Sequence, residues 1–275
     1  AARAFGAREP VARAKCVIAE AEIALASREL GWPVKALDAA RVTLEAHGDP
    51  VNAAHARYLA ARRLLLLGHL DEAERALAGF DAAPLPLASR AARELVNAGI
   101  ALRRLRTKPA RAALARASYA ARHAGIPALV AEIDDAARVL DVPAARLITH
   151  GGERLIRLED VEALRASNAV VIDACRHVVC QSGTRVALAK RPVLFAIARL
   201  LAEAWPGDVS RDTLIAEVFR TRFADESHRV RLRVEIGRLR TELQALAGVD
   251  ATKRGFALAP HRADQVVVLT PPFDE

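Results

Sequence analysis

Hydrophobic and polar positions follow a helical period through the first 147 residues. The pattern repeats every 37 residues, and alanines at three places fall in register: Ala24, Ala61 and Ala98; Ala36, Ala73 and Ala110; Ala39, Ala76 and Ala113. Each repeat predicts two helices, the first over about 11–30, 51–67 and 86–105, and the second over about 33–46, 70–79 and 108–124. A further helix over 127–140 would cap the stack. Since alanines let paired helices approach closely, the pattern predicts an α-helical repeat domain.

The paired helices with small residues at matched places resemble tetratricopeptide repeats. The resemblance is incomplete, because the period is 37 residues instead of about 34 and the aromatic positions are mostly replaced. A generic helical bundle therefore stays open as an alternative. Such a scaffold carries no obvious chemistry and implies a role in sensing, partner binding or dimerisation.

The pattern changes after residue 147. Gly151 and Gly152 interrupt the helical period, and one short helix is expected at 158–164. Three β-rich runs follow at 169–173, 176–180 and 185–188, and the turn 181–184 predicts a hairpin between the second and third. Two helices are then predicted, over 192–204 and over 209–218, the latter with Ser210 as its N-cap.

A third helix, predicted over 225–246, has an unusual polar face. Its apolar stripe is formed by Leu232, Ile236, Leu239, Leu243 and Leu246. The opposite side holds the slim or uncharged residues Val230, Val234, Gly237 and Thr241, flanked by Arg231, Arg233, Arg238 and Arg240. Glu235 is the only acidic residue between Arg229 and Arg240. A slim face with guanidinium groups on both flanks suits a helix that lies in the major groove of DNA.

Two short extended segments around Gly255 follow this helix, and the whole series resembles the OmpR/PhoB-type winged helix-turn-helix domain. The matching segments are Val186-Ala187-Leu188, 208–218, 236–243 and Thr252-Lys253-Arg254-Gly255-Phe256. The resemblance covers about 170–260. Together, the two resemblances imply a mainly α chain in three parts. These are a tetratricopeptide-like repeat domain at 1–147, a linker at 148–168, and a C-terminal α+β winged helix domain at 169–275. The receiver domain that usually precedes this type of domain has no counterpart in residues 1–147.

The resemblance also implies roles for individual residues. Arg233, Val234 and Arg238 correspond to positions that contact base edges, and Arg238 is the best candidate for a bidentate guanine contact. Arg229, Arg231, Arg240 and Thr252 would contact phosphates. Lys253 and Arg254 belong to the wing, where Arg254 would enter the minor groove. Gly237 replaces a frequently basic residue and Arg233 a frequently acidic one, so the operator sequence does not follow.

The positive net charge of the chain favours an anionic partner. The 275 residues carry a formal net charge of +8, although arginine-rich usage is also expected from a GC-rich genome. No acidic residue lies between Glu94 and Glu132, whereas seven basic residues do: Arg103, Arg104, Arg106, Lys108, Arg111, Arg116 and Arg122. This run is either a solvated helix surface or a second contact for DNA or for an acidic peptide.

Catalytic, metal and membrane functions find little support. The eight histidines and three cysteines lack metal-ligand spacing, and neither an enzyme nor a cofactor is expected. Asp134 and Asp135 are adjacent and would splay about a helix, and Ser227 is expected to cap the arginine helix. Cys175 and Cys180 are expected to be reduced thiols in buried strands. No apolar run is long enough to cross a membrane, and we expect a cytoplasmic, nucleoid-associated protein. The chain contains no methionine, so its start is expected to be missing.

These patterns together predict a bacterial DNA-binding transcriptional regulator. The alternative is a protein-interaction adaptor whose winged domain binds protein. Double-stranded DNA is the principal expected partner, followed by RNA polymerase or a regulatory protein or peptide. A homodimer through residues 1–147 is also expected, because the last helix would leave apolar side chains uncovered: Leu129, Val130, Ile133, Ala137 and Leu140.

Overall fold

The computed structural model describes residues 9–78, 85–221 and 223–273. Its contacts divide the chain into residues 1–140, which we call the helical unit, and residues 141–275, which we call the mixed unit. Each unit encloses hydrophobic clusters of its own. In the described ranges, no helix is both long and apolar enough to cross a bilayer.

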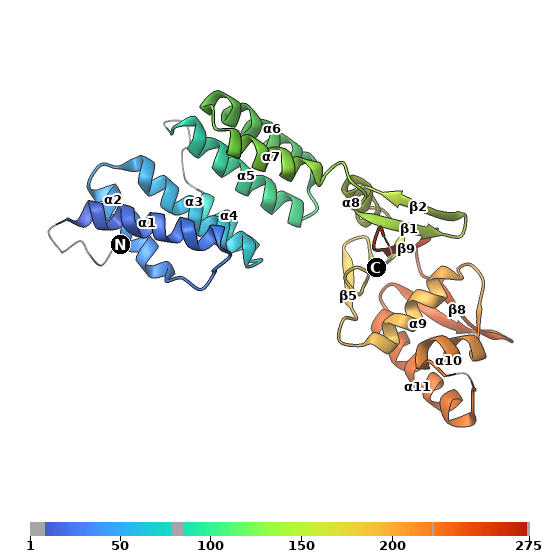
Figure 1. The fold of residues 1–275 in the computed structure, drawn as a ribbon. Helices are drawn as coiled ribbons and strands as arrows, with labels where there is room; N and C mark the ends of the chain where they lie inside the picture. Colours follow the sequence, from blue (N-terminus) through green and yellow to red (C-terminus); the bar gives the residue numbers. More distant parts are fainter. Residues whose placement is uncertain (1–8, 79–84, 222, 274–275) are drawn as a thin grey trace. The chain divides into compact units, whose positions relative to one another are not determined.

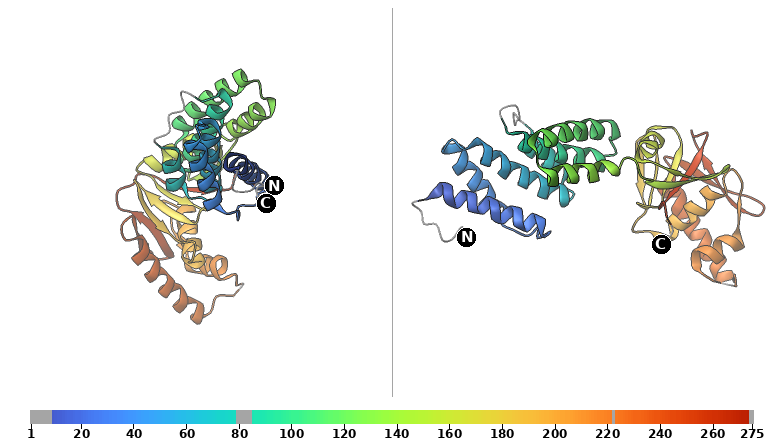
Figure 2. Two further views of the ribbon diagram at one scale, coloured as in Figure 1. Left: turned by 90° about the vertical axis from the view of Figure 1, so that its left-hand side faces the viewer. Right: turned by 45° about the horizontal axis from the view of Figure 1, so that its top comes forward.

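The helical unit consists of helices that pack in successive pairs, as predicted (Figures 1 and 2). The pairs are α1 (Pro10–Ala26) with α2 (Val34–Ala46), α3 (Pro50–Leu66) with α4 (Leu70–Leu77), and α5 (Leu87–Arg103) with α6 (Thr107–Ala124). Helix α3 also packs on α1 and α5, which joins the pairs into one array. The 37-residue register marks packing positions, because Ala61, Ala73, Ala98 and Ala110 have no exposed surface. Ala39, in the first pair, is exposed.

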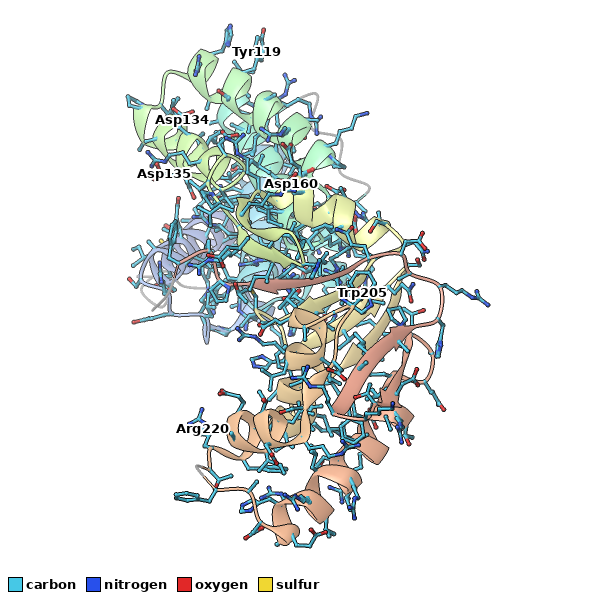
Figure 3. The ribbon with its side chains drawn as sticks, turned by 90° about the vertical axis from the view of Figure 1, so that its right-hand side faces the viewer. Tyr119, Asp134, Asp135, Asp160, Trp205 and Arg220 are labelled. Atoms are coloured by element: carbon cyan, nitrogen blue, oxygen red, sulfur yellow. The ribbon has the colours of Figure 1, made fainter. Side chains whose placement is uncertain are left out.

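Helix α7 (Pro127–Arg138) closes this array against α5 and α6. Ile133 and Leu140 are buried, and Leu129, Val130 and Ala137 pack partly buried in the same cluster. The apolar side chains that were expected to lack cover are therefore covered within the chain, and they give no reason for a dimer. Asp134 and Asp135 are both exposed on α7 (Figure 3).

The mixed unit contains a six-stranded sheet with the order β2-β1-β9-β3-β4-β5. The strands are β1 (Ala145–Thr149), β2 (Gly152–Ile156), β3 (Val170–Asp173), β4 (Val178–Gln181), β5 (Thr184–Ala187) and β9 (Val266–Thr270). The predicted hairpin between β4 and β5 is confirmed, with Gln181 opposite Thr184. Segment 148–168, expected as a linker, holds the end of β1, all of β2 and the short helix α8 (Leu158–Ala166).

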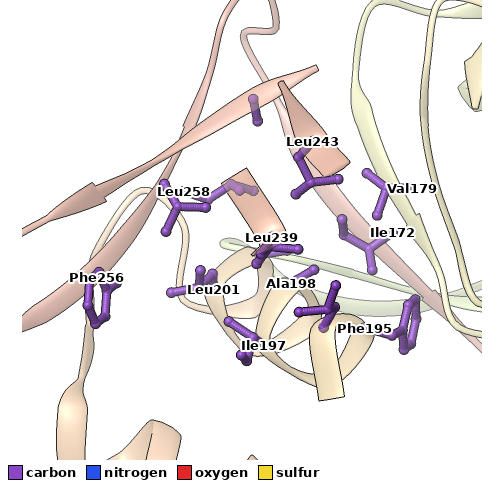
Figure 4. Close-up of a cluster of buried hydrophobic side chains, with 14 of the residues drawn as sticks. Ile172, Val179, Phe195, Ile197, Ala198, Leu201, Leu239, Leu243, Phe256 and Leu258 are labelled. Carbon is purple, nitrogen blue, oxygen red and sulfur yellow. The ribbon is translucent and has the colours of Figure 1, made fainter. Parts of the chain in front are cut away.

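A second, three-stranded sheet accompanies three helices. Helix α9 (Pro192–Glu203) is followed by β6 (Val209–Ser210), α10 (Arg211–Phe219), α11 (Glu226–Leu243), β7 (Ala247–Ala251) and β8 (Gly255–Pro260), and the strand order is β6-β8-β7. Side chains from both sheets and all three helices form one core (Figure 4). The predicted apolar stripe of α11 lies in this core, and Leu246 joins it from beyond the helix end.

Local capping determines where two of these helices begin. The hydroxyl oxygen of Ser210 accepts from the backbone N–H of Thr213 at 3.0 Å, which confirms the predicted cap of α10. In α11 the cap is Asp225, whose carboxylate accepts from the backbone N–H of His228 at 2.8 Å. The expectation that Ser227 caps this helix was wrong. Asp225, two residues earlier, has an extended backbone, and its carboxylate occupies the N-cap position.

The three cysteines are free thiols. Cys180 lies buried in β4, as expected, but Cys175 lies in the turn between β3 and β4 and is exposed, so the expectation of a buried strand position was wrong for Cys175. Burial raises the pKa of the Cys180 thiol, and partial desolvation together with the nearby carboxylate of Asp173 raises that of the Cys175 thiol.

Candidate nucleic-acid interface

The solvent side of α11 is slim and open. Val230 and Val234 are 50% and 48% exposed, and Gly237 and Thr241 are also exposed. A Cβ atom added at Gly237 would meet no heavy atom within 4 Å. Because a side chain here would project into open space, another molecule can approach the helix backbone closely. We call this surface, with Arg229, Arg231, Arg233 and Arg238 beside it, the α11 face.

The arginines at the start of the α11 face are weakly paired. One carboxylate, Glu226, lies 3.7 Å from a guanidinium nitrogen of Arg229 and 4.0 Å from one of Arg233. All three side chains are about half exposed or more. Exposed pairs at such distances contribute little to stability, so both guanidinium groups are available to a ligand.

Arg231 has a different neighbour, since its guanidinium carbon lies 4.5 Å from the ring centroid of Phe219 at the end of α10. The ring holds the guanidinium plane without using its N–H donors. Arg231 is therefore positioned by the preceding helix, and among the described residues nothing is hydrogen-bonded to its donors, which can bind an anion. The sequence pattern did not identify this role of Phe219.

Arg238 is the residue that was predicted to make a bidentate contact with a guanine base. Its Nη1 donates to the carboxylate of Glu235 at 2.8 Å, and its side chain is 62% exposed whereas that of Glu235 is 13% exposed. A guanidinium has five N–H donors, so this bond leaves most of them unused. Arg238 also borders an open groove between α11 and the start of α9 that Arg191, Val193 and Glu235 line.

Arg240 lies apart from these residues. Its Nε donates to the backbone oxygen of Val249 at 2.7 Å, which ties α11 to β7. The arrangement gives Arg240 a structural role between helix and sheet, and the predicted phosphate contact remains open to its other nitrogens.

The β7–β8 hairpin ends in a tight turn that hydrogen bonds hold. The backbone N–H of Thr252 donates to the oxygen of Gly255 at 3.0 Å, and the N–H of Gly255 donates to the hydroxyl of Thr252 at 2.8 Å. That hydroxyl donates in turn to Asp208 at 2.6 Å. Its one hydrogen is thus engaged, so the phosphate contact predicted for Thr252 would require this bond to open.

A residue that the sequence pattern missed, Arg211, fastens the turn to the start of α10. Its Nη1 donates to the backbone oxygen of Lys253 at 3.2 Å and its Nη2 to that of Thr252 at 3.1 Å. Its guanidinium also lies 5.3 Å from the ring centroid of Phe256. Arg211 directly follows the cap residue Ser210, so local sequence indicated the helix start but not the contact across 42 residues.

Two cations remain free at the tip of the hairpin. Lys253 and Arg254 are exposed, and neither side chain forms an ion pair with a described residue. The predicted residues therefore fall into an exposed set on α11, a free pair at the hairpin tip, and two residues, Arg240 and Thr252, that the fold itself uses. In the described ranges no group of three histidine, cysteine or acidic side chains could hold a metal ion.

Comparisons with models of protein families, with curated proteins and with solved structures find no match for this chain.

Proposed function

We propose that this chain is a bacterial DNA-binding transcriptional regulator whose mixed unit contains a winged helix-turn-helix of the OmpR/PhoB type. The observation that carries the proposal is the α11 face, a slim, open helix surface bordered by four exposed arginines. The order α9, α10, α11 and a hairpin with a cationic tip supports it. In this proposal α11 enters the major groove and the turn 252–254 reaches the minor groove.

Each residue has a distinct role in this arrangement. Arg233, Val234 and Arg238 contact base edges, Val234 through apolar contact with a thymine methyl group. Arg229 and Arg231 bind phosphates, and Arg254 enters the minor groove beside Lys253. The hairpin and α11 are held in place by hydrogen bonds of Arg211, Arg240 and Thr252. These residues affect DNA binding by positioning the groups that contact DNA.

The helical unit has the proposed role of a tetratricopeptide-like regulatory domain, which binds a protein or peptide or joins two copies of the chain. An open groove beside α1, α3, α5 and α7 supports partner binding. Within it Arg62 donates to the Tyr58 hydroxyl and to Glu132, each at 2.5 Å, so one guanidinium spans from α3 to α7. A homodimer remains part of the proposal, and RNA polymerase is a further partner that a regulator of this type would contact.

Binding of the full chain to random duplex DNA tests the proposal. Fluorescence anisotropy should detect binding at about 50 mM salt and a loss of affinity of about 10³-fold or more at about 200 mM salt, if six or more phosphates are contacted. Arg233→Ala combined with Arg254→Ala should weaken binding strongly. The control Arg13→Ala combined with Arg90→Ala removes two exposed arginines of the helical unit outside α6.

Failure of the wild-type chain to bind any duplex at low salt would reject the proposal. The protein-interaction adaptor would then be favoured, with the α11 face as a surface for an acidic protein. If the control weakens binding as much as the paired change at Arg233 and Arg254, binding is diffuse charge attraction and no specific interface exists.

A further inference from the structure

Helix α6 presents a second surface with the same construction as the α11 face. At 100° per residue, Lys108, Ala112, Ala115 and Tyr119 form its exposed centre line, with Arg111 and Arg122 on one flank and Arg116 and His123 on the other. All eight side chains are exposed, whereas the opposite side of the helix is buried against α5 and α7. We call these eight residues the α6 face.

The centre line presents one aromatic ring and no large aliphatic side chain to a partner. Ala112 and Ala115 leave the middle of the face low, and the one large side chain is Tyr119, 62% exposed. Tyr119 projects outward from α6 (Figure 3), and its ring lies 4.1 Å from that of His123, centroid to centroid. Hot spots of protein interfaces include tyrosine and arginine, but they cluster in well-packed pockets, whereas Tyr119 is the only aromatic ring on the centre line and stands beyond two alanines. A low, cationic face with a hydroxyl-bearing ring suits an extended polyanion better.

Two of the four lysine and arginine side chains on the α6 face, Lys108 and Arg122, lie near its two ends. Arg116 pairs with Glu94 at 2.7 Å, and that carboxylate is 13% exposed. Lys108 and Arg122 form no ion pair with any described residue. No acidic residue stands between Glu94 and Glu132 in the chain. A solvated helix face usually intersperses both signs at i, i+4, which stabilises the helix; α6 does not.

We infer that the α6 face contacts the phosphate backbone of the duplex DNA that the mixed unit binds, which extends the footprint without reading sequence. This inference rests on the proposed function. The 18 residues of α6 span about 27 Å, a length over which duplex DNA presents about 16 phosphate charges. Lys108 and Arg122 lie near opposite ends of that span and supply cations to separate phosphates.

The chain connection makes such contacts effective even if each is weak. Only residues 139–144 separate α7 from β1. A contact between the α6 face and the duplex that the mixed unit binds is therefore intramolecular, and effective concentrations for such contacts reach the order of millimolar when the connection lets both sites engage. Weak phosphate contacts then add to affinity, in the way that a second binding module does.

The test compares the full chain with its Lys108→Gln, Arg122→Gln double variant on random duplexes of about 12 and about 40 base pairs, since about one helical turn accommodates a single recognition helix. On the long duplex, the slope of log affinity against log salt should fall in magnitude by about 2, and affinity near 0.1 M salt by about tenfold. The short duplex should show little change. The matched control, Arg13→Gln with Lys35→Gln, removes the same charges from exposed positions on α1 and α2. Its salt slope on the long duplex should stay larger in magnitude than that of the α6 double variant.

Tyr119→Phe provides a second measurement, because it retains the ring and removes the hydroxyl. It should weaken binding to the long duplex a few-fold without a change in the salt slope, since no charge is lost. Circular dichroism of each variant establishes that the exposed substitutions leave α6 folded.

An unchanged salt slope for the α6 double variant overturns the inference. If substitutions at Arg233 and Arg254 still weaken binding in that case, the proposed function stands and the α6 face alone fails. If the double variant loses binding to a polyglutamate peptide but keeps its DNA affinity, the face serves an acidic protein and the inference is also overturned. If wild type binds neither duplex, the proposed function fails together with it.

Discussion

Replacing Arg238 by alanine tests the proposed base contact with little disturbance of the fold. The Arg238 side chain is 62% exposed and its structural partner is Glu235, three residues earlier on the same helix. A helical ion pair of this kind contributes about 0.2 to 0.5 kcal/mol to stability. Because Glu235 is 13% exposed and would lose its partner, we expect the free energy of unfolding, measured in urea, to fall by about 1 kcal/mol.

The expected effect on binding is larger and confined to one position. A bidentate contact between a guanidinium and a guanine provides about 1 to 3 kcal/mol of discrimination against another base, equivalent to about a 5- to 150-fold change in affinity. Arg238 can make this contact without leaving Glu235, because only its Nη1 is used in the ion pair. Loss of the side chain should thus remove preference at one base pair and preserve it elsewhere.

The assay is selection from a random duplex library, followed by measured affinities for the selected site and for single-base variants of it. Arg229→Ala is the comparison, since this exposed arginine at the start of α11 has a proposed phosphate contact and should weaken every sequence alike while lowering the salt slope by about 1. If Arg238→Ala instead weakens all sequences by one factor, the base contact is refuted and Arg238 contacts a phosphate.

Three stability predictions follow from local geometry, each measured by urea unfolding. Gly237→Ala should raise the free energy of unfolding by about 0.5 to 1 kcal/mol, because its Cβ would meet no atom within 4 Å; a decrease would mean that this face is covered. Gly255→Ala should lower it by at least about 3 kcal/mol, because its Cβ would lie 1.7 Å from the backbone oxygen of Val209, and a small effect would show that β6 and β8 separate easily. Asp49→Ala should cost about 1 kcal/mol at neutral pH, since the Asp49 carboxylate caps α3 by accepting from the N–H of Asn52 at 3.1 Å. Hydrogen bonds from the Asn52 side chain and backbone hold the pKa of Asp49 below its ordinary value, so this stabilisation is present above about pH 4 and is lost as pH falls through the lower folded-state pKa; a difference between wild type and variant that persists at low pH would contradict the role of the charged form.

Local periodicity was sufficient for every helix of the helical unit. The observed starts of α2, α4 and α6, at 34, 70 and 107, lie within one residue of the predicted starts at 33, 70 and 108. Each helix carries its own 3.6-residue pattern, and every break except 104–106 contains glycine or proline, so neighbouring residues hold most of the information. The same reasoning identified the Ser210 cap and the β4–β5 turn, both of which close over three residues.

The six-stranded sheet was beyond this kind of reasoning. Strand β9 lies between β1 and β3, yet it follows β3 in the chain by more than 90 residues, and it pairs in parallel with β3. A short valine run such as Val266–Thr270 does not specify its partners, because strand pairing depends on where distant segments lie in the fold. Segment 148–168 accordingly looked like a linker although part of it is sheet.

Sequence alone determined that α11 has an apolar stripe, a slim opposite face and a surplus of arginine, because these properties follow from residue types at helical spacing. The tertiary structure decided which of those cations remain free. Arg240 donates to Val249, whereas Arg231 lies over Phe219 and keeps its N–H donors for a ligand; beyond the helix, the hydroxyl of Thr252 is bonded to Asp208 across 44 residues. A side chain's availability depends on the partners that folding brings to it, and no helical period contains that information.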